Sequence, residues 1–274
     1  MLIPLAATLA GTFSLVYTKY LMSQRKMGYL PYTVQSFWAI LLVLLPGIFF
    51  IPPPQAISLQ DIILFILMVV LACFWNIIFY HGIKEESLIE SQLVVMLVPL
   101  LAALFGFVFF QDERKIATLL FLVMGVAAIA WAHISHHQLK FHSGSWLIII
   151  ASIFIAFESV LVKLILPAFT IYWLYFMRVV AITLILTIFF PKAAKPDRST
   201  IVHMIAIGIL VAFQFIMTYW SFIVYGIVFS NLIFSLLPLF TATAGYFIFH
   251  EHVSRKQLLA GIILLVCVVI ATIF

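Results

Sequence analysis

The stretch FYHGIKEESLIESQLVVMLVPLLAALFGFVFF, residues 79–110, aligns without a gap with TYWSFIVYGIVFSNLIFSLLPLFTATAGYFIF, residues 218–249. The alignment joins Tyr80 with Tyr219, Ser91 with Ser230, Leu93 with Leu232, Pro99-Leu100 with Pro238-Leu239, Gly106 with Gly245 and Phe110 with Phe249, and it sets Gln92 opposite Asn231. Matched leucines alone would be weak evidence in so apolar a chain. Matched Tyr, Ser, Pro and Gly residues indicate that the chain contains two related halves.

The composition of the whole chain is typical of an integral membrane protein. Apolar residues make up 66% of the 274 residues, and charged residues make up 8%. Soluble domains carry about 25% charged residues, and a chain of this length has no core large enough to hide so much apolar surface. In lipid the backbone polar groups must be paired internally, so we predict an all-α integral membrane protein.

Ten runs are long enough to cross a hydrocarbon core of about 30 Å, which takes about 20 apolar residues. They lie near residues 2–22, 30–51, 61–80, 88–110, 116–134, 146–166, 168–190, 201–222, 226–249 and 257–274. The chain then divides into halves at residues 1–138 and 139–274, with five predicted spans in each. Because five is odd, the second half enters the membrane from the opposite side. This predicts an inverted repeat, a transporter arrangement whose substrate site lies near the midplane.

The order of motifs resembles the drug/metabolite transporter superfamily, specifically the bacterial ten-span EamA-type permeases. A lysine ends the first span of each half (Lys19 and Lys163), the segment PAFTIYWLYFMR (167–178) carries a proline and an arginine, and each fourth span carries a proline before an acidic loop. A final span with a glycine closes each half. The resemblance implies a multi-pass protein of the bacterial inner membrane that transports a small molecule, without enzymatic activity or a cofactor. The first half departs from the pattern, because Trp38 stands where the second half has Arg178.

Two ionisable residues, Glu158 and Arg178, lie within otherwise apolar spans. A charge at the centre of a membrane helix costs about 2.5–3.5 kcal/mol on insertion scales, so such a residue suggests a function and a partner. Counted from the turn at Pro167, both lie roughly 12–17 Å from the same surface at 1.5 Å per residue. We therefore predict that they pair or face one cavity. A purely structural ion pair is the alternative reading.

Other polar and aromatic side chains lie at helical spacing within the spans. The predicted substrate-binding set is Glu158, Arg178, Tyr175, Asn231, Gln92, Gln214, Asn76, Trp38 and Trp75, with Glu158 also a candidate for proton coupling. For each amide, hydrogen bonding between helices is as good an explanation as lining a cavity. Lys19 and Lys163 are expected to extend to the lipid headgroups.

The remaining features carry little chemistry. The histidine groups HISHHQLKFH (133–142) and HEH (250–252) are interpreted as lying at span ends, and no metal site is expected. Cys73 and Cys267 each fall inside a span, so no disulfide framework is indicated. The net charge of +5 sits in membrane-flanking loops and does not indicate nucleic-acid binding.

Orientation and substrate stay open at this stage. Lys and Arg gather in loops that follow odd-numbered spans, which places the termini outside, whereas the family resemblance implies cytoplasmic termini. The leading hypothesis is a secondary transporter of a small polar metabolite such as an amino acid or related zwitterion, working as a monomer or homodimer. The alternatives are lipophilic-cation efflux by proton antiport, a translocase of lipid-linked headgroups, and a membrane subunit that transports nothing.

Overall fold

A computed structural model describes residues 2–54, 57–114, 142–195, 198–250 and 255–273, with a few isolated positions between residues 115 and 141. Seven segments of these residues are long and apolar enough to cross a membrane. They are Leu2–Ser23, Tyr29–Phe49, Leu59–Glu85, Glu90–Phe109, Ser143–Ile165, Ile171–Phe189 and Thr200–Asn231. The chain is thus a multi-pass, helical membrane protein, as its composition predicts.

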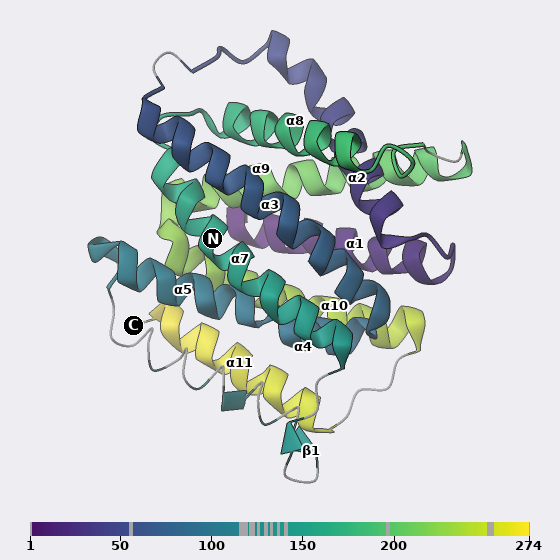
Figure 1. The fold of residues 1–274 in the computed structure, drawn as a ribbon. Helices are drawn as coiled ribbons and strands as arrows, with labels where there is room; N and C mark the ends of the chain where they lie inside the picture. Colours follow the sequence, from purple (N-terminus) through teal and green to yellow (C-terminus); the bar gives the residue numbers. More distant parts are fainter. Residues whose placement is uncertain are drawn as a thin grey trace.

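The described helices lie side by side in one bundle (Figure 1). The first part contains α1 (Leu2–Ser23), α2 (Tyr29–Leu44), the 3-10 helix η1 (Leu45–Phe49), α3 (Leu59–Glu85), α4 (Leu88–Val95), α5 (Leu97–Phe109) and the 3-10 helix η2 (Gln111–Glu113). The second part contains α7 (Ser143–Ile165), α8 (Ile171–Phe189), α9 (Arg198–Phe234), α10 (Leu236–Phe249) and α11 (Arg255–Ile273). Between them, β1 (Ile134–Ser135) pairs antiparallel with β2 (Gln138–Leu139).

The observed helices follow most of the predicted spans, with three differences. The predicted ninth span, 226–249, corresponds to the end of α9 together with α10. The predicted tenth span, 257–274, corresponds to α11, and neither span is among the seven long apolar segments. The fifth predicted span, 116–134, lies almost wholly outside the described residues. The fourth span is divided into α4 and α5.

Polar side chains fix where several helices begin. Ser58 accepts a hydrogen bond from the backbone of Asp61, whose carboxylate in turn accepts from the Ser58 backbone, which is a capping box. Thr170 caps α8 in the simpler way, by accepting from a backbone N–H of the first turn. Such caps satisfy backbone donors that have no partner inside the helix.

The two stretches that align in sequence also break at matching places. Helix α4 gives way to α5 at Met96, and the helical run 227–249 is interrupted at Ser235, 139 residues later. In both, a proline (Pro99 or Pro238) follows three residues after the break. A proline has no N–H and its ring clashes with the carbonyl four residues earlier, so it interrupts a helix at this point.

A second interruption lies within α9, where Gly226 has φ 80° and ψ 170°. Other residues rarely adopt this backbone conformation, so glycine permits a reversal here without a longer loop. The alignment sets Gly226 opposite Ser87, which caps α4 by accepting from the backbone of Glu90. Both aligned helical runs therefore start at equivalent positions by different means.

Helices from the two parts of the chain pack against each other. Helix α3 packs on α7, and α1 packs on α9. In the same way α5 lies against α7 and α10 lies against α1. Gly82 allows the close approach of α3 to α7, because a Cβ at this position would lie 2.6 Å from Cγ1 of Ile148. The first described helix of each part of the chain, α1 or α7, thus contacts the third helix of the other part, α9 or α3.

Lys19 does not extend to the headgroups, so that prediction is wrong. Its side chain is buried, and its ammonium donates hydrogen bonds to the carbonyl oxygens of Ile83, at 2.9 Å, and Glu86. These carbonyls end α3, where the helix dipole favours a cation. Lys163, in contrast, lies nearer the surface, 3.7 Å from the exposed carboxylate of Asp112.

Candidate functional site

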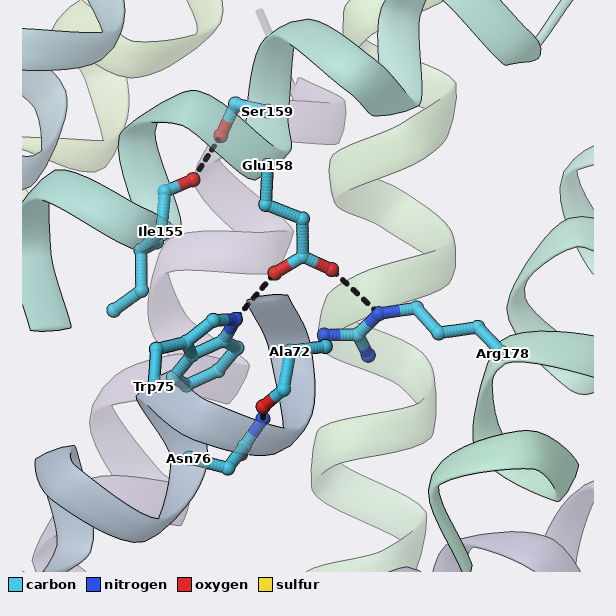
Figure 2. Close-up of polar contacts among 7 residues, drawn as sticks. All are labelled: Ala72, Trp75, Asn76, Ile155, Glu158, Ser159 and Arg178. Carbon is cyan, nitrogen blue, oxygen red and sulfur yellow. Dashed lines mark hydrogen bonds and ion pairs between the residues drawn. The ribbon is translucent and has the colours of Figure 1, made fainter. Parts of the chain in front are cut away.

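The centre of the bundle holds the ion pair that the sequence predicts. Nε of Arg178, on α8, donates to Oε1 of Glu158, on α7, at 2.6 Å. The indole N–H of Trp75, on α3, donates to the other carboxylate oxygen, Oε2. Figure 2 shows the two donors approaching Glu158 from different helices. Three helices from both parts of the chain therefore meet at one carboxylate.

The pair is deeply buried: the side chains of Arg178 and Glu158 are 1% and 6% exposed. In this setting a charge is tolerated only when it is paired and hydrogen-bonded. The pair uses one guanidinium nitrogen, and Nη2 of Arg178 has no hydrogen-bond partner. Glu158 is thus held on both oxygens, whereas Arg178 keeps at least one unused donor.

Aromatic rings surround the guanidinium. Its Cζ lies 5.1 Å from the centre of the Phe215 ring and 5.9 Å from that of Trp75, distances suited to cation–π attraction. Tyr175, one helical turn before Arg178, stacks on Phe215 at 5.3 Å and meets Tyr219 edge-on at 5.8 Å. The hydroxyls of Tyr175 and Tyr219 are buried and lack hydrogen-bond partners.

A cavity of about 180 Å³ borders this cluster. Glu158, Trp75, Phe215 and Tyr219 line it, and its other walls come from α1, α4, α5 and α10. Most of its surface is apolar. The volume is below the range of about 300–1,000 Å³ typical of sites for drug-sized ligands, which fits a small solute.

The two helix interruptions lie at the cavity wall. Val95 and Pro99 line it from the first interruption, and Asn231 and Phe234 line it from the second. The carbonyls of Val95 and Phe234 are those that a proline four residues later leaves without a helical donor. Both residues are among those that line the cavity.

The structure brings together some predicted site residues and separates others. Gln214 and Asn231 line the cavity, and the Asn231 amide donates to the Ile227 carbonyl. Asn76 is buried but points to the Ala72 carbonyl, at 2.8 Å, as Figure 2 shows, and is not part of the lining. Gln92 is fully buried with both amide atoms unpaired and also lies outside the lining.

Trp38 lies away from this site. It is 38% exposed, and its indole N–H donates to Thr187 on α8 at 3.0 Å. Helices α1 and α7 line the cavity, whereas α2 and α8 contribute no lining residue.

Several lining residues are outside the set predicted from sequence. They are Tyr80 and Tyr219, which the alignment joins, and Thr8, Ser14, Ser159 and Thr218. Small hydroxyl residues are common within membrane helices, where they bond to the carbonyl four residues earlier, as Thr8 does to Pro4. The matched tyrosines are the signal that could have indicated this surface.

One group of possible metal ligands occurs among the described residues, at the end of α3. Ligand atoms of Glu86, Glu90 and His142 lie within 4.8 Å of one another. Glu86 already accepts from the backbone N–H and the hydroxyl of Ser145, at 2.9 and 3.0 Å, and so caps α7. A role in joining helices explains its burial. The histidines at 133, 136, 137 and 252 lie outside the described residues.

Comparisons with known proteins agree with this architecture. A solved structure described as "Crystal structure of protein" is similar to the chain with a TM-score of 0.69 and 15% sequence identity, over 97% of this chain and 96% of that one. At this identity the likeness concerns the fold. No curated protein matches the chain at a comparable level of significance. Residues 142–273 match the EamA-like transporter family. This match, which lies in the second part of the chain, supports membership of the drug/metabolite transporter superfamily.

Proposed function

We propose that the protein is a secondary transporter that moves a small polar metabolite, such as an amino acid or related zwitterion, across the cytoplasmic membrane. Family membership supports a membrane permease in general terms. The observation that carries the finer proposal is the small, mostly apolar cavity with a buried Glu158–Arg178 pair at its wall. A solute with both charges could exchange contacts with such a pair, its carboxylate near Arg178 and its ammonium near Glu158.

The transport mechanism in this proposal is alternating access between two inverted five-helix halves, 1–138 and 139–274, with ten spans in all. Two features support it: the helix interruptions at Met96 and Ser235, and the exchanged packing of α1 on α9 and α3 on α7. The cavity lies where elements of both halves meet. Rocking of one half against the other would expose it to each side in turn.

Glu158 is the candidate for proton coupling, because it is the carboxylate that lines the cavity. Export is the direction that we propose, in the inner membrane of a bacterium. Efflux of lipophilic cations is supported less well, since Arg178 lies 2.6 Å from Glu158 and offsets its charge. The cavity is also small for such ligands.

The test is a thermal-shift screen on the detergent-purified protein with amino acids, nucleosides, amines and lipophilic cations. A ligand at a hundred times its Kd stabilises the folded state by about 2.7 kcal/mol, which is a measurable shift. We expect a zwitterion to stabilise the protein and the effect to be lost in Glu158→Gln and Arg178→Ala. Uptake or release of the same compound by proteoliposomes completes the test. Stabilisation by lipophilic cations alone would refute the proposed substrate class.

A further inference from the structure

Besides the amide of Gln92, three buried donor groups of the described residues have no hydrogen-bond partner. They are Nη2 of Arg178 and the hydroxyls of Tyr175 and Tyr219. All three side chains are at most 2% exposed. Buried polar groups in proteins are nearly always paired, and an unpaired one calls for an explanation such as a ligand.

The three groups form one cluster around the ring of Phe215. Cζ of Arg178 lies 5.1 Å from the centre of this ring, and the rings of Tyr175 and Tyr219 lie 5.3 and 6.3 Å from it. Phe215 and Tyr219 belong to the cavity wall. A solute in the cavity can therefore reach the cluster through Tyr219.

The neighbouring polar groups are already satisfied. Both oxygens of Glu158 accept hydrogen bonds from Arg178 and Trp75. The ring of Tyr80, the residue aligned with Tyr219, packs edge-on against Tyr32 at 4.8 Å, and the hydroxyl of Tyr32 bonds to Thr18 at 2.5 Å. Tyr219 thus brings one unused donor to the cavity wall, and those of Arg178 and Tyr175, which do not line the cavity, lie around Phe215 beside a carboxylate whose oxygens are both occupied.

We infer that this cluster is the subsite for the carboxylate of the transported solute. A carboxylate offers two oxygens with about four acceptor positions and no donor, which is the complement of two hydroxyls and a guanidinium N–H. The acid group is then the feature that the protein recognises, and the ammonium of an amino acid is dispensable. This inference rests on the proposed transport function and narrows its substrate class to small carboxylic acids.

The first experiment compares compounds that differ in one charged group. Valine, its 2-oxo acid, isobutylamine and valine methyl ester are titrated into the detergent-purified protein, with the corresponding phenylalanine series beside them. We expect both acids of a series to bind within about tenfold of each other, and the amine and the ester at least about tenfold more weakly, because a hydrogen bond to a charged group is worth at least that factor.

Two variants then test the cluster itself. Tyr219→Phe and Tyr175→Phe each remove one hydroxyl that has no internal partner. Both variants should unfold at the same temperature as the parent protein or higher, while their Kd for the acids rises about tenfold or more. Tyr246→Phe, on the exposed face of α10, removes a hydroxyl far from the cluster and should leave the Kd unchanged.

The possible results separate this inference from the proposed function. Preferred binding of the amines, or unchanged acid affinity in both variants, overturns the carboxylate subsite while transport of another solute stands. Loss of stability with full acid affinity in the variants also overturns it, because the hydroxyls would then serve the fold. If no compound of any class binds or is transported, the proposed function fails together with the inference.

Discussion

Removing one partner of the Glu158–Arg178 pair should destabilise the protein more than removing both. Two unit charges 2.6 Å apart attract by about 6 kcal/mol at an effective dielectric constant of about 20. Desolvation of both ions offsets much of this attraction, so the intact pair contributes little net stability. A single buried charge, however, keeps its desolvation cost without the attraction, and this typically costs about 3–5 kcal/mol.

The perturbation is a double-mutant cycle with Glu158→Gln, Arg178→Met and the combined variant. Glutamine keeps an oxygen that can accept the indole N–H of Trp75, so the first variant mainly removes the charge. The free energy of unfolding of each single variant should be about 3–5 kcal/mol lower than that of the parent protein. That of the combined variant should lie within about 2 kcal/mol of the parent value. The coupling energy should therefore exceed about 4 kcal/mol in favour of the pair.

The free energy of unfolding is measured by titrating the purified protein with sodium dodecyl sulfate in mixed micelles and following helical circular dichroism. Trp75→Phe serves as a control that removes one neutral donor and leaves both charges in place. The reasoning is refuted if the two single losses add in the combined variant. It is also refuted if either single variant loses less than about 1 kcal/mol, the value expected of a solvated surface pair.

Three further changes test other contacts of the structure. Lys19→Met should lower the free energy of unfolding by about 1.5–3 kcal/mol in the same titration, because it removes a buried ammonium from two helix-end carbonyls. Lys163→Met, nearer the surface, should lower it by less than about 1 kcal/mol. Gly226→Ala should lose about 1–3 kcal/mol from the strain of φ 80°, and an unchanged unfolding curve would argue against this backbone reversal. Trp38→Phe should leave ligand affinity in the thermal-shift assay unchanged, whereas Trp75→Phe should weaken it, because only Trp75 lines the cavity.

The central ion pair could be predicted from the sequence because a charged residue within a membrane span is costly unless it is paired or faces the protein interior. Glu158 and Arg178 lie at equal depth on neighbouring spans, and an unpaired charge there is costly, so counting residues from Pro167 was enough. The same logic failed for Lys19. Its position near a span end allowed extension to the headgroups, but the carbonyls at the end of α3 come from a distant part of the sequence.

The cavity wall was harder to predict than the pair. Polar residues of a membrane helix can bond to their own backbone, as Asn76 does, or line a cavity, as Gln214 does, and helical spacing does not distinguish the two. The helix interruptions were visible only as Pro99 and Pro238. That both interruptions lie at the cavity wall depends on how α4, α5 and α9 pack.

The difference between Arg178 and Trp38 shows why two aligned positions of the sequence need not carry the same chemistry. Arg178 faces the bundle interior, where Glu158 neutralises it, whereas Trp38 lies on α2 with more than a third of its side chain exposed. An arginine at position 38 would face lipid without a partner, at a cost of several kcal/mol. A tryptophan there instead places an apolar ring against lipid and satisfies its N–H through Thr187. In our proposal the donor cluster around Phe215 depends on Arg178 and has no counterpart at Trp38, so a solute with a single acid group would find one matching subsite.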